Sequence, residues 1–172
     1  MSTTSYAVMS SIDLRSAAAA DGPMLWKWRN DPLTRRMFRT GHMIPWEEHA
    51  AWFAEVLQDP GKILLIAQDA GGPIGVVRFD SIADGRAEVS INVNPERRGQ
   101  RLGQAALVAA CGHAFSELGL TQLSADIRPD NAASIAIFTR IGFGFQGVHE
   151  GLNTYRLTPQ QFRPSHSEPL IS

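Results

Sequence analysis

Hydrophobic and polar residues follow two different periods along this chain of 172 residues. Between residues 44 and 62, apolar side chains such as Trp52 and Val56 recur at the i, i+4 spacing of a helix. Three later runs are short, rich in isoleucine and valine, and separated by the turn-forming stretches AGG and IADG. These runs cover residues 62–69, 72–80 and 86–94. The pattern predicts a long helix followed by an antiparallel meander of three strands.

The apolar runs on either side of the meander complete the expected order of elements. A short strand is expected near residue 12, followed by short helices in MLWKWRNDP and LTRRMF. After the meander we expect a helix over 101–118, a strand in LSADIRP, a helix in NAASIAIFTRIGF, and strands in FQGV and TYRL. This order predicts one α+β domain over residues 1–172, with a mixed, mainly antiparallel central sheet flanked by helices. Within it, the polar and proline-broken segment 159–172 is expected to form a loosely ordered tail.

Composition argues against several classes of protein. A net charge of −1 gives no general reason to expect binding to nucleic acid or to a membrane surface. The single cysteine, Cys111, excludes a disulfide framework and a multi-cysteine metal site. The sequence shows neither a basic, apolar leader nor a run of about 18 apolar residues, so we expect a cytoplasmic protein.

A basic turn with two glycines precedes the helix expected over 101–118. The stretch ERRGQRLG carries three arginines around Gly99 and Gly103. Glycines let the chain turn tightly, and backbone N–H groups at the start of a helix can converge on an anion. Arginine side chains add positive charge suited to phosphate oxygens. Taken alone, the turn is equally compatible with a solvated, arginine-rich helix start, and it lacks the Gly-Lys-Ser/Thr of a P-loop.

The basic turn is followed by a second motif, DNAASIAIFTRIGF, in which Asp130 or Asn131 can cap a helix directly after a strand. The order of strand, anion loop, helix, strand and capped helix resembles the Gcn5-related N-acetyltransferase (GNAT) superfamily. Its loop pattern is Arg/Gln-x-x-Gly-x-Gly/Ala, and RGQRLG at 98–103 is similar, with Arg101 replacing the middle glycine. Its later block is Asn-x-x-Ala/Ser-x-x-Leu-Tyr-x-x-x-Gly-Phe, and here Phe138 replaces the tyrosine.

The resemblance spans residues 10–158 and implies the GNAT fold together with an activity. That activity is transfer of an acetyl group from acetyl-CoA, the cosubstrate, to a primary amine without a metal ion. The loop would bind the coenzyme pyrophosphate, backbone groups of Ile91 and Val93 would pair with the pantetheine arm, and Asn131 would contact the coenzyme. The family's tyrosine commonly protonates the leaving thiolate, which Phe138 cannot do. The coenzyme-binding residues expected by resemblance are Ile91, Val93, Arg98, Gly99, Gln100, Arg101, Leu102, Gly103, Asn131 and Phe138.

A general base would take the proton from the attacking amine. Glu88 stands on the polar face of the strand expected at 86–94, and the resemblance favours it as a base acting through a water molecule. Glu48 and His49 in WEEHAAWF are the other candidates. We expect Glu88 and His49 to be catalytic. The alternative for Glu88 is a solvated carboxylate on a strand, and the alternative for His49 is a structural histidine packed between tryptophans.

The N-terminal third would shape the acceptor site, since it holds all four tryptophans together with polar residues. Its pattern Trp-Arg-Asn-Asp-Pro … Trp-x-x-His-x-x-Trp-Phe is similar to the superfamily branch that acetylates amino sugars linked to nucleotides, as in pseudaminic acid biosynthesis. We therefore expect Trp28, Arg29, Asn30 and Trp52 to bind a small-molecule amine, with an amino sugar as first choice. An aromatic core would explain the tryptophans equally well.

Two other functions stay open. The N-terminal helical pattern is also similar to that of ribosomal-protein acetyltransferases, whose acceptor is a protein N-terminus. The replaced tyrosine and glycine also fit a non-catalytic module that binds coenzyme A or a partner. Beyond the acceptor we expect no nucleic-acid or membrane partner, and exposed apolar residues in the last strands would favour a homodimer.

Overall fold

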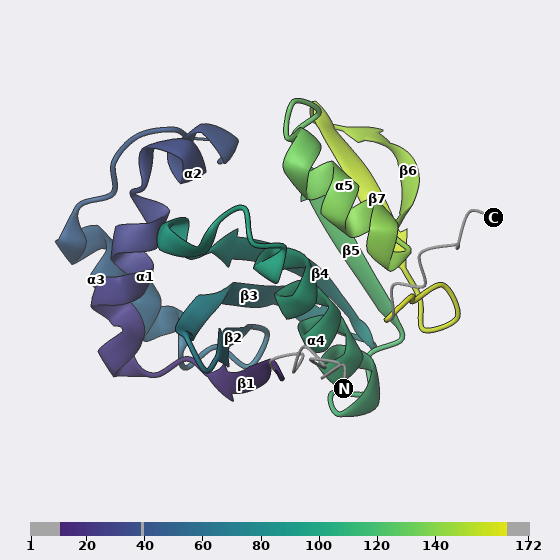
Figure 1. The fold of residues 1–172 in the computed structure, drawn as a ribbon, viewed down its shortest axis with the longest axis horizontal. Coiled ribbons are helices and arrows are strands. Elements are labelled where there is room, and N and C mark those ends of the chain that lie inside the picture. The colour runs from purple at the N-terminus through teal and green to yellow at the C-terminus, as the bar shows by residue number, and fades with distance from the viewer. Residues whose placement is uncertain (1–10, 39, 165–172) are drawn as a thin grey trace, which may run out of the picture.

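A seven-stranded sheet organises the chain (Figure 1). The computed structural model describes residues 11–38 and 40–164. The strands follow the order β1-β2-β3-β4-β5-β7-β6, and every neighbouring pair is antiparallel except β4 and β5. The expected fold class, a mixed and mainly antiparallel sheet flanked by helices, is confirmed.

The elements follow the order that the sequence predicts. The strands are β1 (Asp13–Ser16), β2 (Ile63–Asp69), β3 (Gly72–Ala83), β4 (Arg86–Val93), β5 (Gln122–Ile127), β6 (Gly144–His149) and β7 (Leu152–Leu157). The helices are α1 (Gly22–Arg29), α2 (Pro32–Met37), α3 (Trp46–Val56), α4 (Leu102–Ser116) and α5 (Ala132–Ile141). Two short 3-10 turns, η1 (Ala19–Asp21) and η2 (Pro95–Arg97), precede α1 and the basic turn.

Alternation along the central strands sends apolar side chains into two cores. On one face of the sheet, Val77 of β3 packs in a cluster with Leu107 of α4. The next residue back, Val76, belongs to a second cluster with Leu25 of α1 and Phe53 of α3. Successive residues of a strand point to opposite faces, so α4 covers one side of the sheet while α1 and α3 cover the other.

The parallel pair β4 and β5 is joined over a short length only. Its register runs from Arg86 opposite Gln122 to Glu88 opposite Ser124, which is three residue pairs. Beyond Glu88 the two strands diverge, as their ribbons show in Figure 1, and we call the region between them the opening. β5 continues along β7 instead, so the sheet is split along its middle on one side of Glu88.

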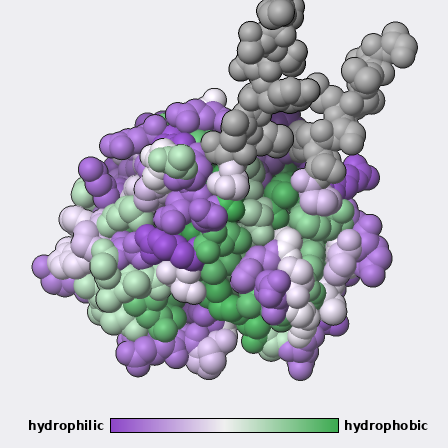
Figure 2. Space-filling view, turned by 60° about the horizontal axis from the view of Figure 1, so that its bottom comes forward, coloured by the Kyte–Doolittle hydropathy of each residue, from purple (hydrophilic) through white to green (hydrophobic). Residues whose placement is uncertain are grey.

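Some hydrophobic residues remain at the surface of the domain. On the face shown in Figure 2, a band of hydrophobic residues runs between hydrophilic ones. On β6, the last strand in the order of the sheet, Phe145 and Val148 are 57% and 66% exposed. The last strands thus carry exposed apolar residues as expected, while the homodimer that these would favour stays a prediction.

The start of the segment 159–172 packs against the domain. The ring of Phe162 meets Phe115 of α4 edge-on, with the ring centres 5.6 Å apart. The backbone N–H of Arg163 donates to the last carbonyl of α5 over 2.8 Å. Residues 165–172 lie outside the described residues, and the loose order expected of them stays a prediction.

Gly142 ends α5 in a conformation that few side chains tolerate, with φ of 117°, and a Cβ atom there would lie 2.1 Å from the carbonyl oxygen of Gln161. Gly151 also has a positive φ, 79°, but a Cβ atom added to it would meet nothing within 4 Å. We expect Gly151→Ala to lower the free energy of unfolding by about 1–2 kcal/mol. Gly142→Ala should lower the free energy of unfolding by about 1–3 kcal/mol more than Gly151→Ala, because the added methyl group also collides with the backbone of Gln161. Urea unfolding measures both, and equal losses would contradict the packing of Gln161.

Candidate active site

The edge of β4 that faces the opening carries backbone groups turned away from β3. The N–H of Asn94 donates to the carbonyl of Ile74 across the β3–β4 ladder over 2.7 Å. Bonded residues alternate along an antiparallel pair, so Ile91 and Val93 turn their N–H and C=O groups to the other side. The same parity places the carbonyl of Gly85 towards β5, where it accepts from the N–H of Thr121 over 2.7 Å and from that of Gln122, the first residue of β5, over 3.2 Å. The backbone of Ile91 and Val93 can therefore pair with an extended ligand.

The basic turn is anchored to the sheet at its base. Both terminal nitrogens of Arg97 contact the carboxylate of Asp69 at the end of β2, at 2.6 and 2.8 Å. The hydrogen bond from Arg97 holds the pKa of Asp69 below its usual range. Asn94 closes the turn from the other side, because its side-chain oxygen accepts from the N–H of Glu96. Arg97 thus serves the structure of the turn rather than a ligand.

The tip of the turn leads directly into the first residues of α4. Gly99 has φ of 76°, and Arg101 is the N-cap of α4 with φ of 59°. Arg101 therefore occupies a left-handed conformation that favours glycine. The first N–H groups of a helix have no acceptor within the helix and can bind an anion. Gln100, just before α4, is exposed, so the tip of the turn is accessible to such an anion.

Arg98 ties the turn to helix α2. Its Nη2 atom donates to the carboxylate of Asp31 at 2.6 Å and to the hydroxyl of Thr34 at 2.7 Å. Asp31 also caps α2 by accepting from two backbone N–H groups. The hydroxyl of Thr34 in turn lies 3.5 Å from the side-chain oxygen of Asn92 on β4. Arg98 was expected to bind the coenzyme, and its side chain here positions the turn.

Gly103 lets the start of α4 approach the end of β4. A Cβ atom at this position would lie 2.9 Å from a methyl carbon of Val93 and 3.8 Å from one of Ile137. Gly103 and its neighbour Leu102 are the first residues of α4. The structure thus brings the turn and the open edge of β4 together, as expected for residues that share one ligand.

Helix α5 begins across the opening, after β5 (Figure 1). The side-chain oxygen of Asn131 caps it by accepting from the N–H of Ser134 over 3.2 Å. Phe138 is only 2% exposed, and its ring meets Phe143 edge-on with centres 4.9 Å apart. Phe138 therefore belongs to the core and presents almost no surface to a ligand, whereas Asn131 caps the start of α5.

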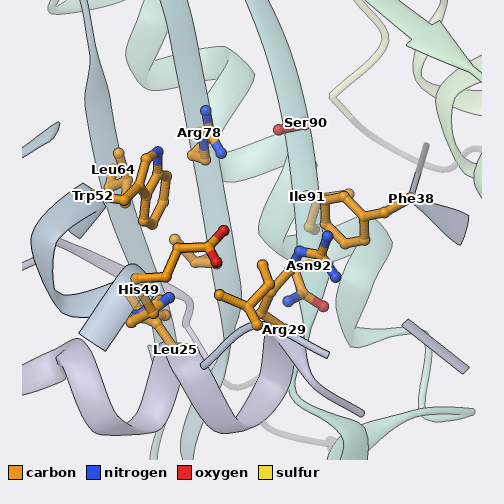
Figure 3. Close-up of a pocket in the computed structure, with 13 residues that line it drawn as sticks. Leu25, Arg29, Phe38, His49, Trp52, Leu64, Arg78, Ser90, Ile91 and Asn92 are labelled. Atoms are coloured by element: carbon orange, nitrogen blue, oxygen red, sulfur yellow. The ribbon is translucent and has the colours of Figure 1, made fainter. Parts of the chain in front are cut away.

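A cavity of about 330 Å³ lies between α1, α3 and the strands β2, β3 and β4 (Figure 3). Its wall includes Ile91, whose backbone also faces the opening, so the cavity and the open edge meet at the same strand. The lining residues come from α1, the segment between α2 and α3, α3, and the strands β2, β3 and β4. They are Leu25, Arg29, Phe38, Ile44, Glu48, His49, Trp52, Leu64, Val76, Arg78, Ser90, Ile91 and Asn92.

Only two of the four expected acceptor residues line this cavity. Arg29 and Trp52 do so, whereas Trp28 is 5% exposed in the core and Asn30 binds both backbone groups of Ile44, at 2.8 and 2.9 Å. Trp28 and Asn30 contribute instead to a second hollow of about 730 Å³. Consecutive helical residues point about 100° apart, which is why neighbours on α1 cannot all face one cavity.

The two expected catalytic residues stand in different places. Glu88 does not line the cavity, although it lies on the same face of β4 as Ser90, which does. His49 lines the cavity but is 3% exposed, and its Nε2 donates to the carbonyl of Gly22 over 3.1 Å. Burial lowers the pKa of His49, and the ring stacks on Phe53. These contacts indicate a neutral histidine that supports the α1–α3 pair.

The sequence matches a known domain over most of its length. The family model of the acetyltransferase (GNAT) domain aligns with residues 12–144. The chain belongs to the GNAT acetyltransferase family. The open strand edge, the basic turn and the cavity are therefore parts of a GNAT domain.

Curated relatives of this GNAT domain include small-molecule acetyltransferases. An L-methionine sulfoximine/L-methionine sulfone acetyltransferase of Pseudomonas aeruginosa is 30% identical over 146 residues, which cover 80% of this chain and 83% of that protein. A mycothiol acetyltransferase of Thermobispora bispora is 29% identical over 138 residues and 76% of this chain. The alignment spans only 40% of that longer protein.

Solved structures share the GNAT fold. Spermidine N-acetyltransferase from Vibrio cholerae, in complex with CoA and spermine, superposes with a TM-score of 0.77 at 17% identity, covering 87% of this chain and 96% of that one. Aminoglycoside acetyltransferase AAC(6')-Ib in complex with coenzyme A gives 0.76 at 21% identity, covering 88% and 96%. At these identities the likeness concerns the fold alone.

Sequence reasoning missed several cavity residues of this GNAT domain. Arg78 of β3 lines the cavity, donates to Asp80 over 2.9 Å and lies 5.1 Å from the ring of Trp52. An arginine inside the apolar run GVVRFD is a signal that could have marked it. Asn92 alternates with Val93 and shares the polar face of its strand with Glu88, which is a signal in the sequence, whereas Phe38 carries no comparable signal.

Two features of residues 11–38 and 40–164 concern metal ligands and membrane-spanning helices. In this part of the chain no group of three or more His, Cys, Asp or Glu side chains is arranged to hold a metal ion. None of the helices described there has the length and apolar character needed to cross a membrane.

The contact between Arg98 and Asp31 should make stability depend on pH. The hydrogen bond from Arg98 lowers the pKa of Asp31. The ionised carboxylate of Asp31 stabilises the folded state fully above the pKa of an aspartate in the unfolded chain, about 3.9. This stabilisation is lost as the pH falls through the lower pKa of Asp31 in the folded state. We expect Asp31→Asn, which keeps the helix cap, to lower the free energy of unfolding at pH 7 by about 1 kcal/mol. The difference from wild type should close below pH 4, and a constant difference down to pH 2 would contradict the assignment.

Proposed function

We propose that the protein transfers an acetyl group from acetyl-CoA to a primary amine of a small molecule held in the cavity beside β4. The observation that carries the proposal is the open edge of β4, whose free backbone positions at Ile91 and Val93 run from the basic turn to the cavity wall. A ligand with a phosphate end, an extended amide arm and a reactive tip fits this path. Acetyl-CoA has these three parts.

The coenzyme would lie along the opening between β4 and β5. Its pyrophosphate would meet the turn 98–103 and the first N–H groups of α4. The pantetheine amides would pair with Ile91 and Val93 as an added strand, and Asn131 would contact the coenzyme from the start of α5. The thioester would then lie beside Ile91, where the cavity begins.

In the proposed reaction the neutral amine attacks the thioester carbonyl and forms a new C–N bond. The C–S bond then breaks and coenzyme A leaves as a thiolate, while the amine proton passes to a base. An amine of pKa about 10.4 is neutral in about one molecule in 10³ at pH 7, and an amine near 8 in about one in ten. A less basic amine, such as a sugar amine, would therefore require less of the base.

Glu88 is the proposed base, acting through a water molecule. Its side chain shares a face of β4 with Ser90 of the cavity wall, and two residues along a strand span about 7 Å. Glu48 lines the cavity itself and is the second candidate. His49 would contribute by holding α1 and α3 together, since its Nε2 already donates to Gly22.

The acceptor class rests on finer arguments. Arg29 and Trp52 line the cavity and support an amino sugar as acceptor. The other three tryptophans do not line it, because Trp26 packs edge-on against Trp46 and Trp28 is buried. Relatives named for methionine sulfoximine and for mycothiol favour a small molecule over a protein N-terminus. A module that binds coenzyme A without turnover is the remaining alternative.

Release of free thiol from acetyl-CoA with a panel of amines tests the function. We expect turnover with a small amine and little with N-terminal peptides. Glu88→Gln should lower kcat/KM by about 10²-fold or more while the Kd of acetyl-CoA stays the same. Glu48→Gln, at the second candidate base, is measured beside it, and a larger loss of kcat/KM there would assign the role of base to Glu48. Binding of acetyl-CoA without turnover of any amine would contradict the proposal.

Two substitutions in the turn test the coenzyme site. Arg101→Gly relieves the left-handed strain and should raise the free energy of unfolding by about 1 kcal/mol, with only a small change in the Kd of acetyl-CoA. Gly103→Val pushes α4 away from Val93 and should weaken acetyl-CoA binding by about 100-fold. Calorimetric titration measures both, and Gly103→Val binding as tightly as wild type would mean that the coenzyme lies elsewhere.

A further inference from the structure

The cavity contains a positive charge that no ion pair among the described residues balances. Arg29 reaches it from the end of α1, and its guanidinium carbon lies 3.7 Å from the centre of the Phe38 ring (Figure 3). Its Nη1 atom is buried without a hydrogen-bond partner in the part of the chain that the structure describes. The ion pairs found there do not include Arg29, nor Glu48 of the same cavity.

A buried donor without an acceptor is costly, and such groups in folded proteins call for an explanation. Burial and the neighbouring charge of Arg35 lower the pKa of Arg29 from its usual value. An arginine nevertheless stays protonated in proteins. The guanidinium thus remains a cation, stacked on an aromatic ring that fixes its plane.

A second guanidinium on the same wall is balanced in charge but not in hydrogen bonds. Arg78 donates through Nη2 to Asp80, whereas its Nε atom is buried without a partner among the described residues. Ser90 and Asn92 line the cavity on the neighbouring strand. The wall therefore offers donors, and Arg29 supplies its unpaired charge.

We infer that the amine acceptor carries an anionic group, a carboxylate or a phosphate, which Arg29 binds in this cavity. The inference rests on the proposed acetyl transfer and names the substrate class of the same site. Nη1 of Arg29 would donate to one oxygen of the anion, and Nε of Arg78 would be available to another polar atom of the acceptor. The amine would point to Ile91, where the thioester lies.

The size and charge of the cavity narrow the acceptor further. About 330 Å³ is near the lower end of the range for small-molecule pockets, roughly 300–1,000 Å³. An amino acid or a phosphorylated monosaccharide is in keeping with such a volume, whereas a whole nucleotide sugar would extend beyond it. Spermine is bound in the structure of the Vibrio cholerae spermidine N-acetyltransferase, and kanamycin in a structure of aminoglycoside acetyltransferase AAC(6')-Ib. Both molecules are polycations, which Arg29 would repel.

Matched pairs of acceptors test the inference. Thiol release is measured with L-amino acids against their amides, and with glucosamine 6-phosphate against glucosamine, so that each pair differs in the anionic group. The enzymes are wild type, Arg29→Gln, Arg29→Lys and the control Arg36→Gln, which changes an exposed arginine of α2 outside the cavity lining. The Kd of acetyl-CoA and the melting temperature are measured for each.

We expect wild type and Arg36→Gln to prefer the anionic member of one pair by about tenfold or more in kcat/KM. Arg29→Gln should lose that preference and Arg29→Lys should keep part of it, with the Kd of acetyl-CoA unchanged. If the preference appears with the amino acids, the anionic group of the acceptor is a carboxylate, and if it appears with glucosamine 6-phosphate, the group is a phosphate.

The inference is overturned if wild type acetylates amines without an anionic group, or polyamines, at least as well as the anionic acceptors. It is also overturned if Arg29→Gln keeps the preference for the anionic acceptor. The wild-type comparison decides even if Arg29→Gln fails to fold. Absence of turnover with every amine would overturn the proposed acetyl transfer itself, which is a different result.

Discussion

The separation of two parallel strands governs this structure. β4 and β5 pair over three residues and then diverge, which leaves one edge of a central strand without a paired strand among residues 11–38 and 40–164. An unpaired edge inside a sheet is costly unless water or a ligand satisfies it. The basic turn, the start of α4 and the cavity all lie along this edge, so in the proposed reaction coenzyme and acceptor would meet where the strands have parted.

The fold could be predicted closely from the sequence because local signals agreed with one another. The helical spacing around Trp52, the valine-rich strands and the glycine-marked turns each specify one type of element. Their order admits few topologies, and the GNAT family confirms the outcome. The packing of Phe162 was not foreseeable, because a single aromatic residue in a polar segment says nothing about a partner 47 residues away in sequence.

The site could be predicted in part only. Gly103 and Val93 lie close together at the start of α4 and the end of β4, whereas their expected binding of the coenzyme stays a prediction. The acceptor side was harder to foresee, because neighbouring residues such as Trp28 and Arg29 look equally suitable in sequence but point in different directions on a helix. Arg78 enters the cavity from another strand, a relation that only the three-dimensional fold reveals.

Thr34 gives the two halves of the site a shared element. Its hydroxyl accepts from Arg98 of the basic turn and faces Asn92 of the cavity wall. Two binding sites with a common wall are thermodynamically linked, and such linkage is reciprocal. If the proposed coenzyme changes the affinity for the acceptor through Thr34, the acceptor must change the affinity for the coenzyme by the same factor. In the proposed reaction this buried hydroxyl would thereby couple the two binding steps.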